Sequence, residues 1–302
     1  MSSFKKSPWI IHYDASSCNG CDIEVLACLT PLFDVERLGV VNTGNPKHAD
    51  IFLVTGAVNA QSADVIRNIY HQLVEPKVVV AVGICASSAG IFADCYNISG
   101  GVDSVIPVDV YVPGCAARPE AIIDGVVQAL GVLEKKQKEM TALANSLDKA
   151  IYRRADKSDA PEILALQKTA YQSEAEIYGD DSVPALQQTL EEIQKDFDRS
   201  EQVFIKAVVN GKIIGSVRGY AAGDSAFICR ASVHPYFQRR GIGHRLLEEI
   251  EKTFSGVKRF EVFTGQKSER NLKHLHKHGY KEFKTEQGTP ALTWVYLQKE
   301  RK

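Results

Sequence analysis

The chain has 302 residues, of which 44% are hydrophobic and 24% are charged, and its formal net charge is −1. These values are typical of a soluble globular protein and exclude disordered, collagen-like and coiled-coil classes, while the length predicts two domains. The longest apolar stretch, residues 78–84, is far shorter than the ~18–20 residues that span a bilayer. No signal-peptide core precedes Pro8 either, so we expect no direct membrane insertion.

Acidic side chains are in excess in residues 1–130 and basic ones in residues 151–302, which indicates two domains of separate origin. Neither part is basic enough to predict a nucleic-acid partner. Cysteine use is also uneven, because only Cys229 lies beyond residue 115. Without a secretion signal, the other six cysteines favour a metal or iron–sulfur site over a disulfide framework.

The first domain reads as alternating strands and helices. Short β-rich runs predict strands, and helical spacing of apolar residues predicts helices between and after them. The expected strands are 9–13, 35–42, 50–55, 77–82 and 108–112, and the expected helices are 21–29, 62–74 and 119–130. Because strands such as KVVVAVG are continuously apolar, they predict a parallel sheet covered on both faces, in a doubly wound α/β domain.

Four cysteines follow the predicted strands of this domain. Cys18 and Cys21 come after the first strand, Cys85 after KVVVAVG and Cys115 after VDVYVPG. The carboxyl ends of parallel strands meet at one edge of a sheet, so we expect these four thiols to converge there. Zinc and a 4Fe–4S cluster are both open at this point, although zinc sites usually take their ligands from two closely spaced pairs.

The stretches SCNGCDIEVLACLTPLFDVERLG, HADIFLVTG, VVVAVGICASSAG and DVYVPGCAARPEAIIDGV resemble the small subunit of energy-converting, membrane-bound nickel–iron hydrogenases. That subunit is homologous to the cluster-bearing subunit of complex I, and the CNGC spacing is similar to the hydrogenase branch. The resemblance implies that Cys18, Cys21, Cys85 and Cys115 bind one 4Fe–4S cluster. It also implies an electron-transfer oxidoreductase subunit, held at the cytoplasmic face of the membrane by a nickel–iron large subunit and by membrane subunits.

Other side chains near these cysteines have less specific interpretations. We expect Cys28 to be a packing residue and Cys95 to lie in a buried loop. Glu24 is either a carboxylate favoured by a helix N-terminus or a proton-relay group near the cluster. Arg118 either donates hydrogen bonds toward the cluster or a partner, or is a solvated charge.

Residues 131–150 are rich in good helix formers and are expected to extend the helix that begins at Pro119. An apolar stripe is expected to pack on one of the domains, and it consists of Leu133, Met140, Leu143 and Leu147. The predicted organisation is therefore a domain over 1–130, a semi-rigid helical linker over 131–150 and a second domain over 151–302.

The second domain is expected to mix strands and helices in an α+β fold. Asn210–Gly211 is a strong signal for a hairpin between strands 203–209 and 212–220. The other expected strands are 151–154, 226–233, 260–263 and 292–297, and the expected helices are 161–173, 184–197, one after Gly243 and 268–278.

The sequence QRRGIG lies between a predicted strand and a predicted helix. Gly241 and Gly243 allow main-chain N–H groups to point at a phosphate beside a helix N-terminus, and Arg239 and Arg240 add positive charge. The pattern is neither a Rossmann fingerprint, because residue 246 is Leu, nor a Walker loop, because GK[ST] is missing.

VHPYFQRRGIG and the following helix resemble the acetyl-CoA-binding motif of the GCN5-related N-acetyltransferases (GNAT), and KSERNLKHLHKHGY is similar to their next motif. The resemblance implies a mixed sheet and acetyl transfer from acetyl-CoA to an amine acceptor that the sequence does not identify. It places Val233 beside the pantetheine arm and Asn271 near the thioester. The residues that it implies around the CoA pyrophosphate are Gln238, Arg239, Arg240, Gly241, Ile242 and Gly243.

The chain departs from this family where many members carry a tyrosine as general acid, because it has Leu275 there. His274 and His276 are the neighbouring candidates, and transfer without that acid or acyl-CoA binding without turnover are alternatives. The candidates for a substrate base are Glu174, Glu176 and Glu261. His274 and His278 share a helix face, which permits a metal site but is more typical of a solvated basic helix.

Two functions follow. In the first, an electron-transfer subunit of a hydrogenase-type complex carries an added acetyltransferase. In the alternative, the acetyltransferase or an acyl-CoA sensor is the working part, and the first domain docks it to a redox complex. A third, purely structural interpretation has both domains as interaction modules.

Overall fold

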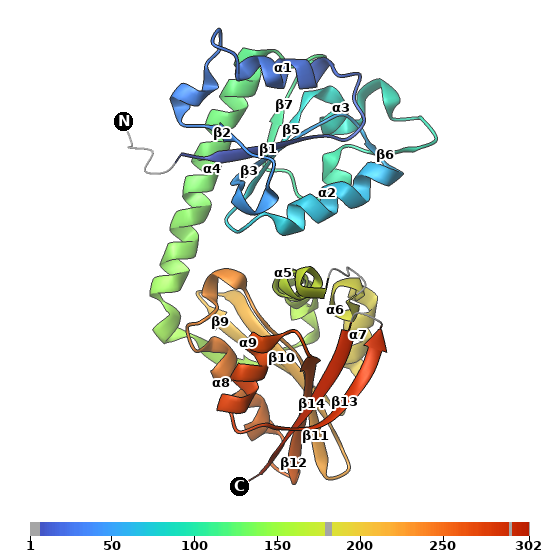
Figure 1. Cartoon of the computed structure of the whole chain (residues 1–302), viewed down its shortest axis with the longest axis vertical. Helices are drawn as coiled ribbons and strands as arrows, with labels where there is room; N and C mark the ends of the chain where they lie inside the picture. Colours follow the sequence, from blue (N-terminus) through green and yellow to red (C-terminus); the bar gives the residue numbers. More distant parts are fainter. Residues whose placement is uncertain (1–6, 179–182, 290–291, 302) are drawn as a thin grey trace. The chain divides into compact units, whose positions relative to one another are not determined.

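The computed structural model describes residues 7–178, 183–289 and 292–301. The chain divides into two compact units, Met1–Thr141 and Ala142–Lys302, which we call the first and the second unit (Figure 1). The boundaries at residues 130 and 150 stay a prediction. Within the described ranges, no helix is both long and apolar enough to cross a bilayer.

The first unit contains a parallel sheet with the strand order β2-β1-β3-β5-β7. Its strands are β1 (Trp9–Asp14), β2 (Val41–Asn42), β3 (Ile51–Thr55), β5 (Val78–Val82) and β7 (Val110–Val112). Every residue of β3 and β5 is buried, which agrees with a sheet covered on both faces. The predicted doubly wound architecture is confirmed.

Helices cover both faces of this sheet. They are α1 (Gly20–Cys28), α2 (Ala60–Gln72), α3 (Gly83–Ser88) and α4 (Pro119–Asn145), and a short antiparallel pair is formed by β4 (Val58–Asn59) and β6 (Ile98–Gly100). Alternate strand residues enter two separate cores: Leu53 packs with residues of α1 and α4, whereas Phe52 packs with residues of α2 and α3. The period of two along each strand therefore decides which helices each side chain meets.

The predicted strand over 35–42 is largely wrong. Val35–Leu38 form a 3-10 turn, and only the two residues of β2 join the sheet. The reason is the backbone on either side of the turn, because Asp34 and Gly39 both have positive φ values, 48° and 79°. A chain that bends twice within six residues cannot stay extended. Val35 in that turn is buried in the core, and Leu38 packs against it.

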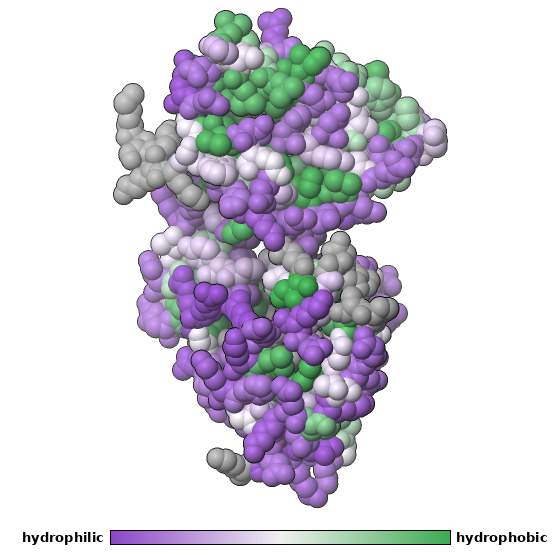
Figure 2. Space-filling view, viewed as in Figure 1, coloured by the Kyte–Doolittle hydropathy of each residue, from purple (hydrophilic) through white to green (hydrophobic). Residues whose placement is uncertain are grey.

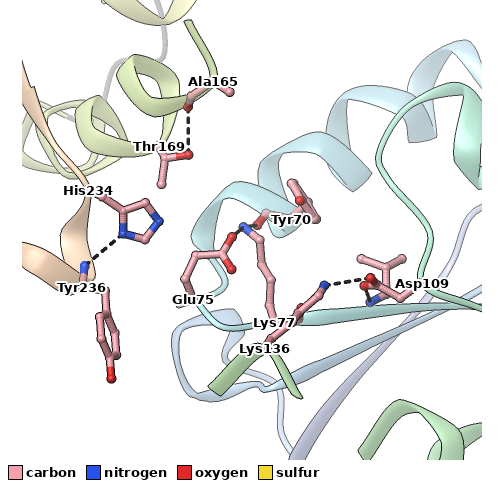
Figure 3. Close-up of polar contacts among 10 residues, drawn as sticks. Tyr70, Glu75, Lys77, Asp109, Lys136, Ala165, Thr169, His234 and Tyr236 are labelled. Carbon is pink, nitrogen blue, oxygen red and sulfur yellow. Dashed lines mark hydrogen bonds and ion pairs between the residues drawn. The ribbon is translucent and has the colours of Figure 1, made fainter. Parts of the chain in front are cut away.

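Helix α4 runs beyond the sheet that it covers, as predicted for residues after Pro119. Leu133 belongs to the core of the first unit. Lys136 Nζ donates to the Lys77 carbonyl at 2.8 Å and to Asp109 Oδ1 at 2.7 Å, while Asp109 Oδ2 accepts from the Val79 N–H at 2.9 Å (Figure 3). These contacts hold α4 to the amino end of β5, opposite the edge where the cysteines lie.

The second unit contains a mixed sheet with the order β13-β14-β12-β11-β10-β9-β8. Neighbours pair antiparallel except β11 and β12, which are parallel. The strands are β8 (Ile151–Arg154), β9 (Gln202–Val209), β10 (Lys212–Ala222), β11 (Ser225–Val233), β12 (Arg259–Gly265), β13 (Lys281–Thr289) and β14 (Leu292–Glu300). The helices are α5 (Ala160–Tyr178), α6 (Pro184–Gln187), α7 (Leu190–Asp198), α8 (Ile242–Thr253) and α9 (Glu269–Lys277).

The predicted hairpin is confirmed, because Asn210 and Gly211 adopt φ values of 48° and 82° between β9 and β10. Strand β13 was not predicted. Residues 281–288 are all exposed, and their sequence KEFKTEQG has no apolar alternation that would reveal an edge strand. The mixed sheet with helices confirms the α+β expectation for this unit.

Candidate functional site

The four predicted ligand cysteines lie at the carboxyl ends of three parallel strands. Cys18 and Cys21 border the start of α1 after β1, Cys85 lies in the first turn of α3 directly after β5, and Cys115 follows β7. Cys18 and Cys115 are exposed, whereas Cys21 and Cys85 are partly buried. Helix α3 was not among the helices expected from the sequence.

The pKa values of Cys85 and Cys21 are affected by the other candidate ligands. Burial raises the pKa of Cys85, and negative charge on Cys115, Cys21 and Cys18 raises it further. Burial also raises the pKa of Cys21, with smaller effects from Cys18 and Cys115. In the described part of the chain, however, no group of three or more His, Cys, Asp or Glu side chains is arranged to hold a metal ion. The structure brings the four thiols to one sheet edge without closing them into such a set.

Glycines make this close approach possible. Gly83 has a φ of 87°, and a Cβ at this position would lie 2.5 Å from Cys21 Sγ. Gly114 has a φ of 141°, and its carbonyl accepts from the Ile84 N–H at 2.9 Å. A side chain at residue 83 would therefore occupy the space of a candidate ligand.

A polar network behind α1 holds the loop that carries Cys18. Asp22 accepts hydrogen bonds from the Ser17 and Thr55 hydroxyls, and His12 Nε2 lies 2.9 Å from Asp22 Oδ1. Burial opposes ionisation of Asp22, but these partners outweigh it and keep its pKa below the usual value. Burial lowers the pKa of His12. Sequence patterns gave no signal for this network, because its members come from separate elements.

The remaining side chains near this edge differ in their outcomes. Cys28 is buried, its pKa is raised to about 11 mainly by burial, and its thiol donates to the Glu24 carbonyl at 3.2 Å, so the packing role is confirmed. The prediction for Cys95 is wrong, because the residue is exposed, and its neighbours Asp94 and Tyr96 are exposed too. Arg118 is exposed and Glu24 is half-buried, and their proposed roles stay predictions.

Apolar side chains are exposed around the candidate ligands. Figure 2 shows such a surface over α1. Ile23 and Leu26 of α1 are 64% and 56% exposed, Leu32 after it is 82% exposed, and Ile84 beside Cys85 is 40% exposed. Contiguous apolar surface of this kind is typical of a protein interface.

In the second unit, the parallel strands β11 and β12 separate partway along their length. Their pairing ends at Ile228 and Val262, and in the described residues no register pair joins Cys229–Val233 to Phe263–Gly265. A bulge in β11 accompanies the separation, because Ser232 pairs with Ser216 but Cys229 pairs with Arg218. Main-chain groups on the facing edges of the two strands are thus left for another partner.

The QRRGIG loop reaches the N-terminus of α8 through two residues in left-handed conformations. Arg239 has a φ of 61° and Gly241 has a φ of 83°. The Gln238 amide donates to the Val233 carbonyl at 2.9 Å, so this side chain holds the loop rather than pointing freely to solvent. Arg239 and Arg240 are exposed, and Ile242 is buried in the core.

His274, Val233 and His234 lie next to this loop or precede it. A Cβ on Gly243 would lie 3.6 Å from His274 Nε2 and 3.7 Å from Val233 Cγ2, which is ordinary contact distance. Before the loop, His234 Nδ1 accepts from the Tyr236 N–H at 3.3 Å (Figure 3). The loop therefore presents a helix N-terminus and two cationic side chains, a combination that suits a phosphate.

Two of the candidate bases, Glu174 and Glu261, already contact other side chains. Glu174 accepts from Asn271 Nδ2 at 2.9 Å and from the Ser268 hydroxyl, so both of its carboxylate oxygens are hydrogen-bonded. Glu261 is buried beside Arg259, whose Nε lies 2.7 Å from Glu261 Oε1. The side chain of Glu176 lies outside the described residues.

The histidines of α9 point in different directions. Leu275 is buried, and His276 is exposed with its Nε2 3.2 Å from Glu282 Oε1. His274 is half-buried, and burial lowers its pKa, while a hydrogen bond with the Gly243 backbone acts in the opposite sense. Of the two histidines considered as acids, His274 is the one beside the QRRGIG loop.

His244 of α8 joins His274 and His278 in a cluster that sequence reasoning missed. The ring centroids of His244 and His278 are 4.0 Å apart, and those of His274 and His278 are 4.8 Å apart. The pKa of His278 is lowered to about 4, first by burial and then by His244 and His274. The pKa values of His274 and His278 both lie below the ordinary value, so these two imidazoles are neutral near pH 7.

Comparison with known proteins assigns both units. The description "NADH ubiquinone oxidoreductase, 20 Kd subunit" matches residues 18–129, and "Acetyltransferase (GNAT) family" matches residues 162–280. The chain belongs to the first of these families through its first unit, and it carries a GNAT domain fused to that unit.

Its relatives include hydrogenase subunits. The "Probable membrane-bound hydrogenase subunit mbhJ" of Pyrococcus furiosus is 50% identical over 130 residues, which are 43% of this chain and 78% of that protein. "Formate hydrogenlyase subunit 7" of Escherichia coli is 43% identical over 45% of this chain and 53% of that protein. These relatives thus match the first unit and leave the second unmatched.

Solved structures resemble either part of the chain. A chain of the membrane-bound sulfane sulfur reductase, an archaeal respiratory membrane complex, is 39% identical over 43% of this chain and 72% of its own, with a TM-score of 0.39. The PaiA N-acetyltransferase of Thermoplasma acidophilum, solved with coenzyme A, is 17% identical over 50% of this chain and 99% of its own, with a TM-score of 0.44.

Proposed function

We propose that the first unit is an electron-transfer subunit whose Cys18, Cys21, Cys85 and Cys115 hold one 4Fe–4S cluster. The observation that carries this proposal is the convergence of four thiols from three strand ends on one edge. The donor set suits an iron–sulfur cluster, which is bound by four cysteine thiolates. Gly83 adds support, because any side chain at this position would overlap Cys21 Sγ. The absence of a side chain there keeps the space around this candidate ligand clear.

Bound there, the cluster supplies one-electron oxidation and reduction. The residues of the chain hold and orient it. Burial raises the pKa of Cys21 and of Cys85, so both thiols must lose protons as the ligands bind, which makes loading pH-dependent. The Asp22 network fixes the start of α1, from which two of the four ligands come.

The partners of this unit follow from its exposed apolar surface and from its relatives. Ile23, Leu26, Leu32 and Ile84 are exposed on or next to α1 and α3, the helices that carry Cys21 and Cys85, and they suit burial against another subunit. We propose that the subunit bound to this apolar surface is a nickel–iron-type large subunit, and that membrane subunits complete the complex. The chain would then sit peripherally at the cytoplasmic face, as part of a membrane-associated complex.

Anaerobic purification tests the cluster. We expect brown protein with about four irons per chain, and loss of that iron in Cys85→Ser but not in Cys95→Ser, which changes an exposed cysteine of the same unit. Tight binding of one zinc by protein reconstituted with iron and sulfide would refute the redox role.

We propose that the second unit binds acetyl-CoA and transfers its acetyl group to an amine. The supporting observation is the separation of β11 from β12 next to the QRRGIG loop. Arg239, Arg240 and the N-terminus of α8 would bind the pyrophosphate, with Gly241, Ile242 and Gly243 forming the turn and Gln238 bracing it. The pantetheine arm would pair with the free edge near Val233.

In the reaction, the amine nitrogen attacks the thioester carbonyl, a C–N bond forms, and the C–S bond breaks. Main-chain N–H groups on the unpaired edge of β11 would stabilise the oxyanion. The amine loses its proton to solvent, and the CoA thiolate gains one from solvent. Leu275 is apolar and buried and cannot donate a proton, and burial lowers the pKa of His274, which leaves this imidazole neutral near pH 7. Asn271 positions Glu174 rather than acting on the substrate.

Equilibrium binding of acetyl-CoA, followed by thiol release on addition of amines, tests this assignment. We expect the double variant Arg239→Ala/Arg240→Ala to weaken acetyl-CoA binding at least tenfold. The matched control is Lys252→Ala/Lys258→Ala, which removes two exposed cations at and beyond the far end of α8. Saturable binding without turnover would instead support the alternative of an acyl-CoA sensor.

A further inference from the structure

A second feature of the β11 bulge concerns the acceptor rather than acetyl-CoA. Arg230 lies within the bulge with a φ of 52°, two residues beyond the last pair of β11 with β12. Its guanidinium carbon is 6.0 Å from the ring centroid of Tyr171 in α5. The side chain is therefore directed to the face of the sheet that α5 covers, at the point where β11 and β12 separate.

Arg230 has no ion-pair partner among the residues that the structure describes. Burial lowers its pKa, and the neighbouring Arg218 lowers it further. Tyr171 does not supply a negative charge, because burial raises its pKa to about 12. Burial likewise raises the pKa of the Cys229 thiol, so this neighbour is also neutral near pH 7.

Asp196 and Glu174 on the neighbouring helices already accept hydrogen bonds from other side chains. Asp196 of α7 accepts from Arg218 Nη1 at 2.7 Å and from Gln188 Nε2 at 2.9 Å. Glu174 of α5 accepts from Ser268 and Asn271. Arg199 Nη1 also lies 3.6 Å from Asp196 Oδ1, so Asp196 is already shared by two other guanidinium groups. Among the described residues, the positive charge of Arg230 is therefore left partly buried without an ion pair, a state that a bound anion would relieve.

The anion that Arg230 would bind is not a phosphate of CoA. The residues proposed for the pyrophosphate are 238–243, whereas Arg230 precedes Val233 by three residues, or roughly 10 Å of strand, in the direction of the thioester. A group bound at Arg230 would therefore approach from the acceptor side. A planar guanidinium is suited to a carboxylate, with which it forms two parallel hydrogen bonds.

We propose that Arg230 is a specificity residue that binds a carboxylate of the acceptor, so that the substrates are small amines that also carry a carboxylate, as free amino acids do. This inference rests on the acetyltransferase function proposed above. Arg218, held by Asp196, keeps the local charge positive without contacting the substrate. Tyr171 supports the Arg230 guanidinium from the side of α5.

The test compares free amino acids with their α-carboxamides as acceptors for the full-length protein. Charge-assisted hydrogen bonds predict a preference in kcat/KM of about 10- to 100-fold for the carboxylate. In Arg230→Gln this preference should fall to within threefold, Arg230→Lys should keep part of it, and the KM for acetyl-CoA should change less than twofold. Arg153→Gln, an exposed position on edge strand β8, is the matched control.

Binding of N-acetylglycine and N-acetylglycinamide to the CoA-bound protein provides a readout without turnover. Wild-type protein should prefer N-acetylglycine at least tenfold, and Arg230→Gln should not. Equal use or binding of acid and amide by the wild type overturns this proposal alone, as does a preference that survives in Arg230→Gln. Failure of the wild type to bind acetyl-CoA overturns the acetyltransferase function itself.

Discussion

Replacing Gly83 with alanine tests the arrangement of the cysteine site most directly. The added Cβ would lie 2.5 Å from Cys21 Sγ and 3.4 Å from the Gly114 carbonyl oxygen. Non-bonded heavy atoms need about 3.5–4.0 Å, so the sulfur must move by about 1 Å or the backbone of α3 must shift. The φ of 87° adds about 1–2 kcal/mol for any residue with a side chain.

Two effects are therefore expected, one on stability and one on iron binding. Overpacking and the unfavourable φ should together lower the free energy of unfolding of the apoprotein by about 2–4 kcal/mol. Displacement of one ligand should reduce the iron bound after reconstitution to less than half of the wild-type amount. Urea unfolding followed by circular dichroism measures the change in stability. Iron content and absorbance measure the change in bound iron.

Gly39→Ala is the matched control within the same unit. Its φ of 79° is similar, but the nearest atom to an added Cβ, at 3.3 Å, is the side-chain oxygen of Ser7, and none of the atoms within 4 Å belongs to a cysteine. This variant should lose stability through its backbone and still bind iron as the wild type does. If Gly83→Ala kept full iron and wild-type stability, the close packing of residue 83 against Cys21 would be wrong.

Three further predictions concern stability. Asp196→Asn should lower the free energy of unfolding by about 3–5 kcal/mol, because it leaves the buried Arg218 without its ion pair. Urea titrations measure this loss, and a loss below about 1 kcal/mol would show that the pair is not buried in solution. Lys136→Met should lower the free energy of unfolding by about 1 kcal/mol, because it removes the hydrogen bonds of α4 with Asp109 and the Lys77 carbonyl. Amide hydrogen exchange should become faster near residue 136, and an unchanged exchange rate would contradict these contacts. Stability should fall as the pH drops from 6.5 toward 4, because His278 with a pKa of about 4 takes up a proton in the unfolded chain but not in the folded one. After allowance for its partial exposure we expect about 1 kcal/mol from this residue, and urea titrations at pH 7 and pH 5 should show a smaller loss in His278→Gln; an equal loss would refute the assignment.

Patterns that depend on neighbouring residues in the chain were readable from the sequence. The parallel sheet follows from continuous apolar strands such as 78–82, and the hairpin follows from Asn210–Gly211. The location of the four candidate ligands could also be predicted, because parallel strands bring their carboxyl ends to one edge of the sheet. These ligands are Cys18, Cys21, Cys85 and Cys115. Strand β13 and the turn at 35–38 escaped, since neither has an apolar period that matches its conformation.

The sequence by itself determined the two fold classes, the loop that precedes α8 and the cysteines at the strand ends, because each is encoded by local spacing or by the order of strands. Only the tertiary structure decided which charges are neutralised. It paired Asp196 with Arg218, gave Glu174 hydrogen bonds from Ser268 and Asn271, and left Arg230 without an ion pair among the residues that the structure describes. These contacts join residues from different elements, and their energies depend on burial and distance, which no linear pattern contains.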